Sequence, residues 1–336
     1  MQKILFFDIN PSPIIYSHLL PAFEKLGFQC TIPRNRLQFD ELKYPGCMTT
    51  TFTEQQRYDI MYKAIQKSDC DTVFLNGANP YYTAVVDACK TYNKQLIYWA
   101  TEDPILYDYM LPKVTKHADL VLSPAIECVE NYRKLGLNAH LMMFACNEDY
   151  HKIGKYNPKY DLDIILQASL YNHPARIKGY DIVLKPAVKL SKQGYKFNVY
   201  GAFWQDPLGM KYLQDMFSYK GFHPNEDIPD ICASSKIVLG VQCDDSSKTQ
   251  QSLRAFEILA SGGFHLTQWT KSMDYWFKNG VHLVTVKNPE EAYERMKYYL
   301  KHESERNKIA QQGYEYVRAN HTYIHRIKES ILPNIE

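Results

Sequence analysis

The stretch best suited to chemistry is a polar loop that runs into a helical pattern, DDSSKTQQSLRAFEILASGGFHLTQW at residues 244–269. Its apolar spacing predicts a helix that starts near Ser252 and stops at the glycine pair after Ala260. Free N–H groups in the first turn of such a helix suit a diphosphate. On a helical projection Glu257 shares a side with Leu253 and Ala260. A carboxylate on an apolar stripe is costly unless a polar partner satisfies it.

Two interpretations of Glu257 are open. The hydroxyls of a nucleotide ribose would satisfy its carboxylate. Alternatively, Glu257 forms an ion pair with Arg254, three positions earlier, on a solvated helix face. The adjacent Gly262-Gly263 pair favours the ribose interpretation, under which Arg254, Ser252 and Leu253 are nucleotide-binding candidates too.

A second cationic group, Arg176-Ile177-Lys178-Gly179, follows the expected strand Asp163–Gln167. A departing nucleoside diphosphate develops negative charge on its bridging oxygen. Fixed Arg176 and Lys178 side chains, with a helix N-terminus, can stabilise that charge without a metal ion. The alternative is that both are solvated basic residues ahead of an ordinary helix.

An acidic pair, Glu102-Asp103, follows the expected strand Gln95–Trp99 in the N-terminal half. One of the two carboxylates is placed to accept the proton of an acceptor hydroxyl. Alternatively, the pair caps a helix that begins near Pro104. Residues at the ends of this strand and its neighbours are further acceptor-side candidates: Asn10, Ser12, Asn76 and Trp99.

A metal site is not expected. Asp161 and Asp163 have D-x-D spacing, but they precede their strand instead of following it. The Asp244-Asp245 pair has no histidine or further acid at ligand spacing.

These candidates are positioned by short apolar runs that alternate with helical patterns along the whole chain. Such alternation predicts right-handed βαβ units and parallel sheets covered on both faces. Ligands bind such sheets at the carboxyl ends of the strands. The expected strands are Lys3–Phe7, Thr72–Leu75, Gln95–Trp99, Leu120–Leu122, His140–Phe144, Asp163–Gln167, Lys196–Tyr200, Lys236–Val241, Phe264–Thr267 and His282–Val286.

The alternation breaks once, in the polar and aperiodic residues 147–161. We therefore expect two doubly wound, Rossmann-like domains that share a cleft. The expected divisions are an acceptor-side domain at 1–150, a linker at 151–161, a nucleotide-binding domain at 162–320, and a C-terminal helix at 321–336 that packs back on the first domain.

Composition excludes several classes of protein. The 336 residues carry a formal charge of only +2, so no basic excess indicates a nucleic-acid surface. No run approaches the roughly 18 apolar residues of a membrane span. The eight cysteines contain no C-x-x-C pair, which argues against zinc-ribbon and thioredoxin-like proteins. Scattered cysteines without a signal peptide favour a reducing cytoplasm.

The C-terminal half resembles a known family. The run RAFEILASGGFHLT, the strand ending in LVTV, and the helical NPEEAYERMKYYLKHESERNKIAQQGYEYVRANHTYIHRI resemble group 1 glycosyltransferases. They are most similar to the branch named for the spore maturation protein CgeB. The N-terminal YWATEDP resembles the tryptophan–acidic–proline signature of that branch. The resemblance covers residues 162–327 well and the N-terminal half more loosely.

The resemblance implies the two-domain GT-B fold, with a nucleotide-sugar donor on the C-terminal domain and the acceptor on the N-terminal one. It implies that Glu257 binds the ribose, and that Arg176 and the Lys178-Gly179 pair meet the diphosphate. It also implies that loops at Gly201 and Phe222 approach the base; the alternative is ordinary turn glycines and a core phenylalanine. Many retaining relatives carry a second glutamate against the donor sugar, where this chain has Thr249.

The combined prediction is a cytoplasmic, metal-independent glycosyltransferase. It would move a hexose-type sugar from a UDP or dTDP donor to a glycan, protein or small-molecule hydroxyl, in spore-surface or cell-surface glycan synthesis. One alternative is a nucleotide-sugar epimerase or hydrolase on the same fold. Another is a protein that binds a nucleotide or glycan without catalysis. The absence of a glutamate at Thr249 is compatible with this alternative. An NAD enzyme is disfavoured because no G-x-G-x-x-G follows the first strand of either domain.

Overall fold

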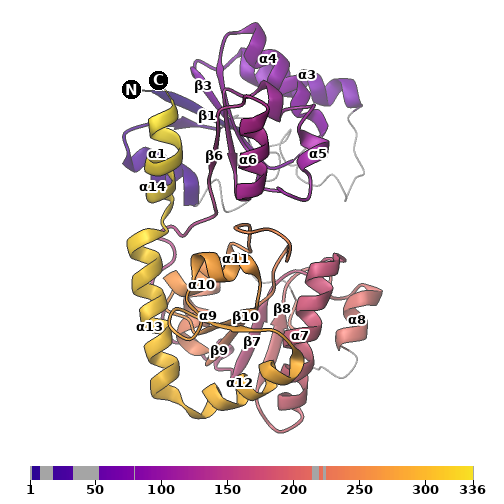
Figure 1. The fold of residues 1–336 in the computed structure, drawn as a ribbon, viewed down its shortest axis with the longest axis vertical. Helices are drawn as coiled ribbons and strands as arrows, with labels where there is room; N and C mark the ends of the chain where they lie inside the picture. The colour runs from indigo at the N-terminus through magenta and orange to yellow at the C-terminus, as the bar shows by residue number, and fades with distance from the viewer. Residues whose placement is uncertain are drawn as a thin grey trace. The chain divides into compact units, whose positions relative to one another are not determined.

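The computed structural model describes residues 2–7, 18–32, 53–78, 80–213, 219–221 and 225–335. The chain divides into two compact units (Figure 1). The N-terminal unit comprises residues 1–143 together with 323–336, and the C-terminal unit comprises residues 144–322. Within the described residues, no helix is both long enough and apolar enough to cross a membrane.

The described part of the N-terminal unit contains a six-stranded parallel sheet in the order β2-β1-β3-β4-β5-β6. Its strands are β1 (Lys3–Phe7), β2 (Gln29–Thr31), β3 (Thr72–Asn76), β4 (Gln95–Trp99), β5 (Leu120–Ser123) and β6 (Ala139–Leu141). Its α-helices are α1 (Leu20–Lys25), α3 (Glu54–Gln66), α4 (Thr83–Thr91), α5 (Tyr107–Met110), α6 (Ile126–Lys134) and α14 (Tyr323–Arg326).

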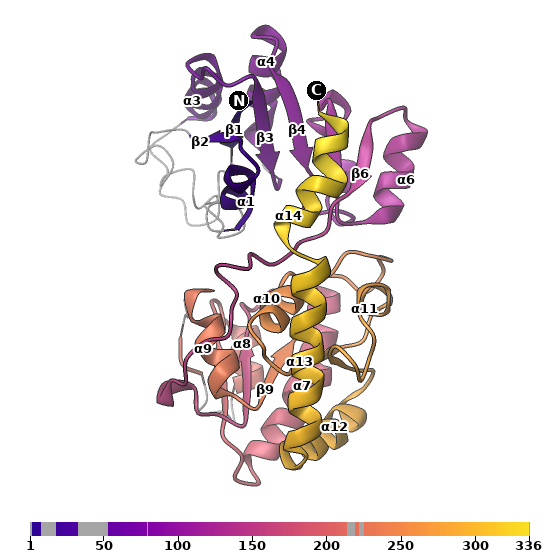
Figure 2. The same cartoon turned by 90° about the vertical axis from the view of Figure 1, so that its left-hand side faces the viewer.

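Alternating side chains of this sheet build two separate cores. Leu5 and Val73 belong to the core that includes residues of α3 and α4. Their neighbours Phe6 and Phe74 point to the opposite face, because successive strand residues alternate sides. There an aromatic cluster forms, in which the Trp99 ring lies 6.3 Å from that of Tyr323 in α14. The C-terminal helix, yellow in Figure 2, therefore covers this face of the N-terminal sheet.

The C-terminal unit has, within the described residues, a five-stranded parallel sheet in the order β11-β10-β9-β7-β8. Its strands are β7 (Ile164–Gln167), β8 (Phe197–Tyr200), β9 (Ile237–Gly240), β10 (His265–Gln268) and β11 (Val284–Val286). Its α-helices are α7 (Pro174–Ser191), α8 (Pro207–Leu213), α9 (Ile228–Ser234), α10 (Arg254–Ala260), α11 (Lys271–Trp276), α12 (Pro289–Lys301) and α13 (Glu303–Asn320).

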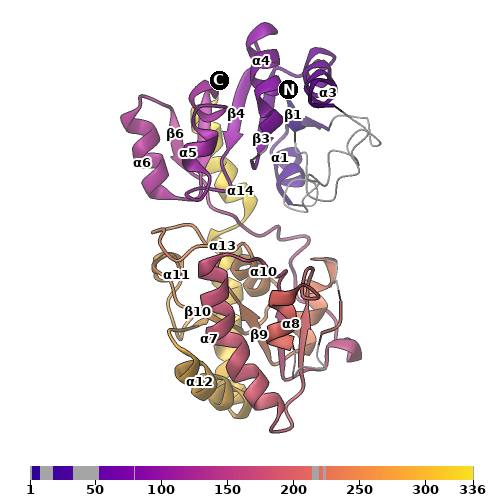
Figure 3. The ribbon, with the colours of Figure 1, turned by 90° about the vertical axis from the view of Figure 1, so that its right-hand side faces the viewer.

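Both faces of this second sheet are buried. Ile164 and Leu166 pack in the core that α7 and α12 cover, and Figure 3 shows these helices together on one side. Ile165, between them, packs instead with Ile231 of α9 and Ile258 of α10. Burial on both faces explains why the strands read as continuous apolar runs rather than as alternating patterns.

The strand order creates a switch point between β7 and β9. The chain leaves β7 through α7 toward β8 on one side, and later enters β9 on the other side. Connections that diverge in this way leave a crevice at the carboxyl ends of the two strands, where α/β sheets bind ligands.

The polar residues 147–161 pack on the C-terminal unit. Arg318 of α13 donates hydrogen bonds to the carbonyl oxygens of Glu148 and His151. The Lys155 N–H donates to Asp230 Oδ1. A side chain at Gly154 would overlap the Pro229 backbone, so this close approach requires glycine. The unit boundary at Met143–Phe144 thus precedes the expected linker at 151–161.

Candidate functional site

A cavity of about 200 Å³ lies at the switch point of the C-terminal unit. It is lined by residues 167–169 after β7, residues 240–241 at the end of β9, and residues 252–254 at the start of α10. Tyr171 also lines the cavity, as does Arg176 from the first turn of α7. The cavity thus brings together two arginines, Arg176 and Arg254, that are far apart in the sequence.

Arg176 provides a cation without a carboxylate partner among the described residues. Its Nη2 donates to Cys243 Sγ at 2.9 Å, and its guanidinium carbon lies 5.3 Å from the Tyr171 ring centroid. A half-buried guanidinium of this kind keeps donors for an anionic ligand.

Arg254 lies in a closed polar group with Glu257 and Asn225. Its Nη1 donates to Glu257 Oε2 and to Asn225 Oδ1, each at 2.6 Å. The Asn225 Nδ2 donates to Glu257 Oε1 at 3.1 Å. The Arg254–Glu257 ion pair therefore exists, but it is not on a solvated face, because Glu257 is fully buried.

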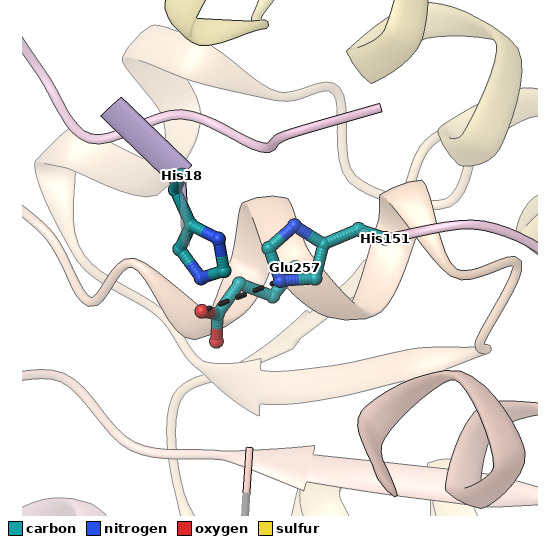
Figure 4. A group of neighbouring side chains, drawn as sticks. All are labelled: His18, His151 and Glu257. Carbon is teal, nitrogen blue, oxygen red and sulfur yellow. Dashed lines mark ion pairs between the residues drawn. The ribbon is translucent and has the colours of Figure 1, made fainter. Parts of the chain in front are cut away.

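His151 is a site residue that sequence reasoning missed. Its Nε2 lies 3.6 Å from Glu257 Oε1 (Figure 4). Its Nδ1 accepts a hydrogen bond from the Asn147 N–H, so a neutral ring carries its proton on Nε2, toward the carboxylate. The segment looked like a linker because it is polar and aperiodic, and no spacing rule connects His151 with Glu257.

The helix after the polar loop starts later than predicted. Its first residue is Arg254, with Leu253 at the N-cap, rather than a residue near Ser252. Gln242 Oε1 accepts the Ser252 N–H, and the Ser252 hydroxyl accepts the Arg254 N–H. Within the described residues, the Leu253 N–H has no hydrogen-bond partner. Of the N–H groups at this helix start that were expected to be free for a diphosphate, only some are therefore free.

Lys178 and Thr249 differ from the other donor-side candidates. The Lys178 ammonium is exposed and lies 2.8 Å from Asp245 Oδ2, and Lys178 does not line the cavity. Thr249 is fully buried, its carbonyl accepts the Trp276 indole N–H, and it does not line the cavity either. The adjacent Gly179 has a packing role, because a Cβ there would overlap the Gln268 side chain.

Gly201 ties together the loops after β7 and β8. Its φ of +148° is in the region that favours glycine, and a Cβ would overlap the Ala168 carbonyl. The Gly201 N–H donates to the Gly221 carbonyl. Phe222, the expected apolar face for a base, lies outside the described residues.

In the N-terminal unit, the two acidic candidates have different environments. Asp103 is 2% exposed, and its Oδ2 accepts hydrogen bonds from Ser123 Oγ at 2.7 Å and from the Tyr132 hydroxyl at 2.9 Å. Burial raises its pKa to about 6, against the opposing effect of these two donors. Glu102 is exposed. The alternative of a helix cap was wrong, since residues 101–106 form turns and α5 begins at Tyr107.

The remaining acceptor-side candidates are buried or undescribed. The Trp99 indole donates to the Met142 carbonyl, and Trp99 is fully buried. Asn76 is 6% exposed, and its carbonyl accepts the Tyr82 hydroxyl. Asn10 and Ser12 lie outside the described residues.

The comparisons with known proteins agree with this fold. The family described as "Glycosyl transferase-like" matches residues 181–331. Anabaena Alr3699/HepE, solved in complex with UDP and glucose, is 12% identical over 100% of both chains, with a TM-score of 0.70. The fold is GT-B. This confirms the fold predicted from the sequence.

Two further solved structures are similar in fold. A glycosyltransferase from Rickettsia africae ESF-5 is 14% identical, covers 99% of this chain and 97% of its own, and has a TM-score of 0.68. A UDP-GlcNAc 2-epimerase from Neisseria meningitidis, bound to UDP-GlcNAc, is 13% identical over 99% and 100%, with a TM-score of 0.58. No curated protein matches the chain significantly.

Proposed function

We propose that this protein is a glycosyltransferase that moves a hexose-type sugar from a UDP- or dTDP-sugar to an acceptor hydroxyl, without a metal ion. One observation carries the proposal: Arg176 and Arg254 line the same cavity at the switch point of the C-terminal sheet. The match to glycosyl transferase-like sequences, and the HepE structures in complex with UDP and with UDP-glucose, support it.

On the donor side, Arg176, Arg254 and the Leu253 N–H bind the diphosphate in this proposal. Glycosidic bond cleavage places negative charge on the departing diphosphate, and preorganised cationic donors stabilise charge that develops in the transition state. We further propose that Glu257 binds the ribose; its carboxylate is fully buried among Arg254, Asn225 and His151 and does not line the cavity, so the ribose hydroxyls must displace one of these partners. Asn225 and His151 hold its carboxylate in place and are positioning residues.

On the acceptor side, the structure favours Glu102 over Asp103 as the base. Asp103 is buried and accepts two hydroxyl hydrogen bonds, so it is poorly placed to reach a substrate. Glu102 is exposed next to it. We also propose that the protein belongs to the CgeB-like branch, is cytoplasmic, and acts in spore-surface or cell-surface glycan synthesis.

The direct test is calorimetric titration of the full chain with UDP and UMP, each with and without EDTA. We expect UDP to bind at least about tenfold more tightly than UMP, because only UDP reaches both arginines. Chelation should leave binding unchanged. Equal affinities, or loss of binding in EDTA, would contradict a metal-free diphosphate site.

A nucleotide-sugar epimerase or hydrolase is the second candidate, since epimerases of the same fold align over almost the entire chain. Product analysis with a donor sugar alone separates the two functions. An epimerase or hydrolase consumes the donor without an acceptor, whereas a transferase requires one for rapid turnover. A non-catalytic binder would bind the donor tightly and leave it intact.

A further inference from the structure

A second cavity of the C-terminal unit lies outside the one that Arg176 and Arg254 line. It has a volume of about 590 Å³ and is lined by side chains from residues 174–182, in the first half of α7, and by residues 287–289 at the start of α12. Figure 3 shows both helices on the same side of the C-terminal sheet. We refer to this cavity as the α7–α12 groove. Its volume is within the range of cavities that hold small organic ligands.

The α7–α12 groove exists because α12 covers only part of α7. Near the end of α7, the Gln193 Nε2 donates to the Tyr293 hydroxyl of α12, and the Lys189 ammonium lies 4.1 Å from the Tyr293 ring centroid. Since α12 begins at Pro289, about one turn before Tyr293, it is too short on this side to reach along the first half of α7. One face of the first half of α7 is therefore left uncovered by α12.

This face of α7 supplies most of the apolar lining. The five α7 residues that line the groove follow the i, i+3, i+4, i+7, i+8 spacing of a single helix face. Three of them are apolar, namely Pro174, Ile177 and Ile182, and α12 adds Pro289. Ile182 belongs to the core of the unit, whereas Ile177 is only partly buried. A ligand with an apolar body would therefore gain free energy by removing Ile177 from water.

Lys287 brings an available cation to the groove. Its ammonium lies 4.8 Å from the Trp269 ring centroid, a cation–π contact that holds the side chain in place. In the part of the chain that the structure describes, no carboxylate forms an ion pair with this ammonium. Glu291 instead accepts the Lys287 backbone N–H, and the exposed Glu290 does not line the groove. The Lys287 ammonium thus keeps its N–H donors for an anion.

The other two charged side chains of the groove already have ionic partners. Asp181 Oδ1 lies 2.9 Å from the Lys185 ammonium. The Lys178 ammonium lies 2.8 Å from Asp245 Oδ2. Because these two charges are paired, the positive charge of Lys287 determines which ligands the groove prefers. It favours an anion over a cation of the same shape.

We propose that the α7–α12 groove binds one amphiphilic organic anion, with its apolar body against Ile177 and the two prolines and its carboxylate or phosphate at Lys287. The apolar lining supplies affinity and the ammonium fixes the orientation, a division of roles that is typical of small-molecule sites. The ligand is a single dissolved molecule and not a membrane surface, because the apolar side chains line a recess and Ile182 among them is only 5% exposed. Arg176 does not line the groove, so this inference does not depend on the proposed nucleotide site.

The test is calorimetric titration of the full chain with octyl phosphate below its critical micelle concentration. Inorganic phosphate has the same head without the tail, and octyltrimethylammonium has the same tail with the opposite charge. We expect each of these to bind at least about tenfold more weakly than octyl phosphate. Saturating UDP and the Arg176→Ala substitution should each leave the affinity for octyl phosphate unchanged. Displacement by UDP, or loss of binding in Arg176→Ala, would place the phosphate in the other cavity and overturn the proposal.

Two substitutions test the two halves of the groove. Lys287→Met keeps a long side chain without the charge, and Ile177→Gln replaces the apolar contact. Each should weaken octyl phosphate binding by roughly fivefold. Lys189→Met is the matched control, because its ammonium also lies against an aromatic ring but does not line the groove. It should bind octyl phosphate as the wild type does, and all three variants should melt as the wild type does.

Three further outcomes are decisive. Equal affinities for octyl phosphate and inorganic phosphate would overturn the proposal, as would wild-type affinity in both Lys287→Met and Ile177→Gln. Binding to phosphatidylglycerol vesicles without binding to octyl phosphate would identify a membrane-facing surface and overturn it too. A wild type that binds octyl phosphate but not UDP would contradict the proposed function and leave this inference standing.

Discussion

The two sheets present different side chains at their carboxyl edges, although both have a switch point beside their first strand. In the C-terminal unit, the described loops hold two arginines at a cavity, and one of them has no carboxylate partner among the described residues. In the N-terminal unit, the loop after β4 buries its aspartate under two hydroxyl donors. The same topology thus holds two arginines at a cavity in one unit and, at Asp103, a buried carboxylate in the other. Function follows from the side chains that the topology carries.

The largest expected effect concerns the acidic pair of the N-terminal unit. Glu102→Gln should reduce transfer by roughly 10²–10⁴-fold, because it removes a general base. Nucleotide affinity, measured by calorimetry, should not change. Asp103→Asn is the matched control, and its transfer rate should remain within a few-fold of the wild type. The assignment is reversed if Asp103→Asn abolishes transfer in a folded protein and Glu102→Gln does not.

The next effect contrasts the two arginines. Arg254→Ala leaves the buried Glu257 carboxylate without its cation, which should lower the free energy of unfolding by about 3–5 kcal/mol. Arg176→Ala removes no ion partner from a described carboxylate, so its unfolding in urea should resemble that of the wild type. Both variants should bind UDP more weakly. Equal destabilisation by the two substitutions would contradict the buried ion pair between Arg254 and Glu257.

The pH dependence of stability should report the burial of Asp103. Its pKa is raised to about 6 in the folded protein from the ordinary 3.8, so the fold favours the protonated form. The wild type should therefore lose stability as pH rises from about 4 to about 6, by up to roughly 3 kcal/mol from this group. Asp103→Asn cannot ionise and should lack this component. If stability depends on pH in the same way in the two proteins, the pKa of Asp103 is not shifted.

The smallest effect concerns ribose recognition. Glu257→Gln keeps the side-chain shape but removes the charge that accepts the hydroxyl protons. Charged hydrogen bonds contribute roughly 1.5–3 kcal/mol, so UDP affinity should fall at least about tenfold. Glu315→Gln, on an exposed position of α13, is the control and should bind UDP normally. An unchanged titration for Glu257→Gln would return Glu257 to a purely structural role.

Local patterns predicted the described strands of both sheets except β2, and part of the site. Continuous apolar runs predicted the buried strands, and Glu257 on an apolar stripe correctly indicated a carboxylate that needs polar partners. Arg254 was the predictable partner because it lies one helical turn away. The helix begins at Arg254, two residues after the start predicted near Ser252, since the Gln242 side chain takes the Ser252 N–H.

Non-local contacts account for what the sequence did not reveal. Asn225 and His151 reach Glu257 from distant segments, and neither has a spacing that indicates this role. Tyr171 looked like one of 27 tyrosines until the loops after β7 and β8 placed it beside Phe203. Asp103 resembled a helix cap, but its partners Ser123 and Tyr132 come from β5 and α6.

The return of α14 to the N-terminal unit has a consequence for synthesis of the protein. The first sheet is complete once Met143 leaves the ribosome, but the helix that covers its aromatic face begins only at Tyr323. At translation rates of about 5–20 residues per second, this interval lasts on the order of 10–40 s. During that time Trp99 lacks its contact with the Tyr323 ring. The packing of the first unit is therefore completed only after the whole second unit has been synthesised.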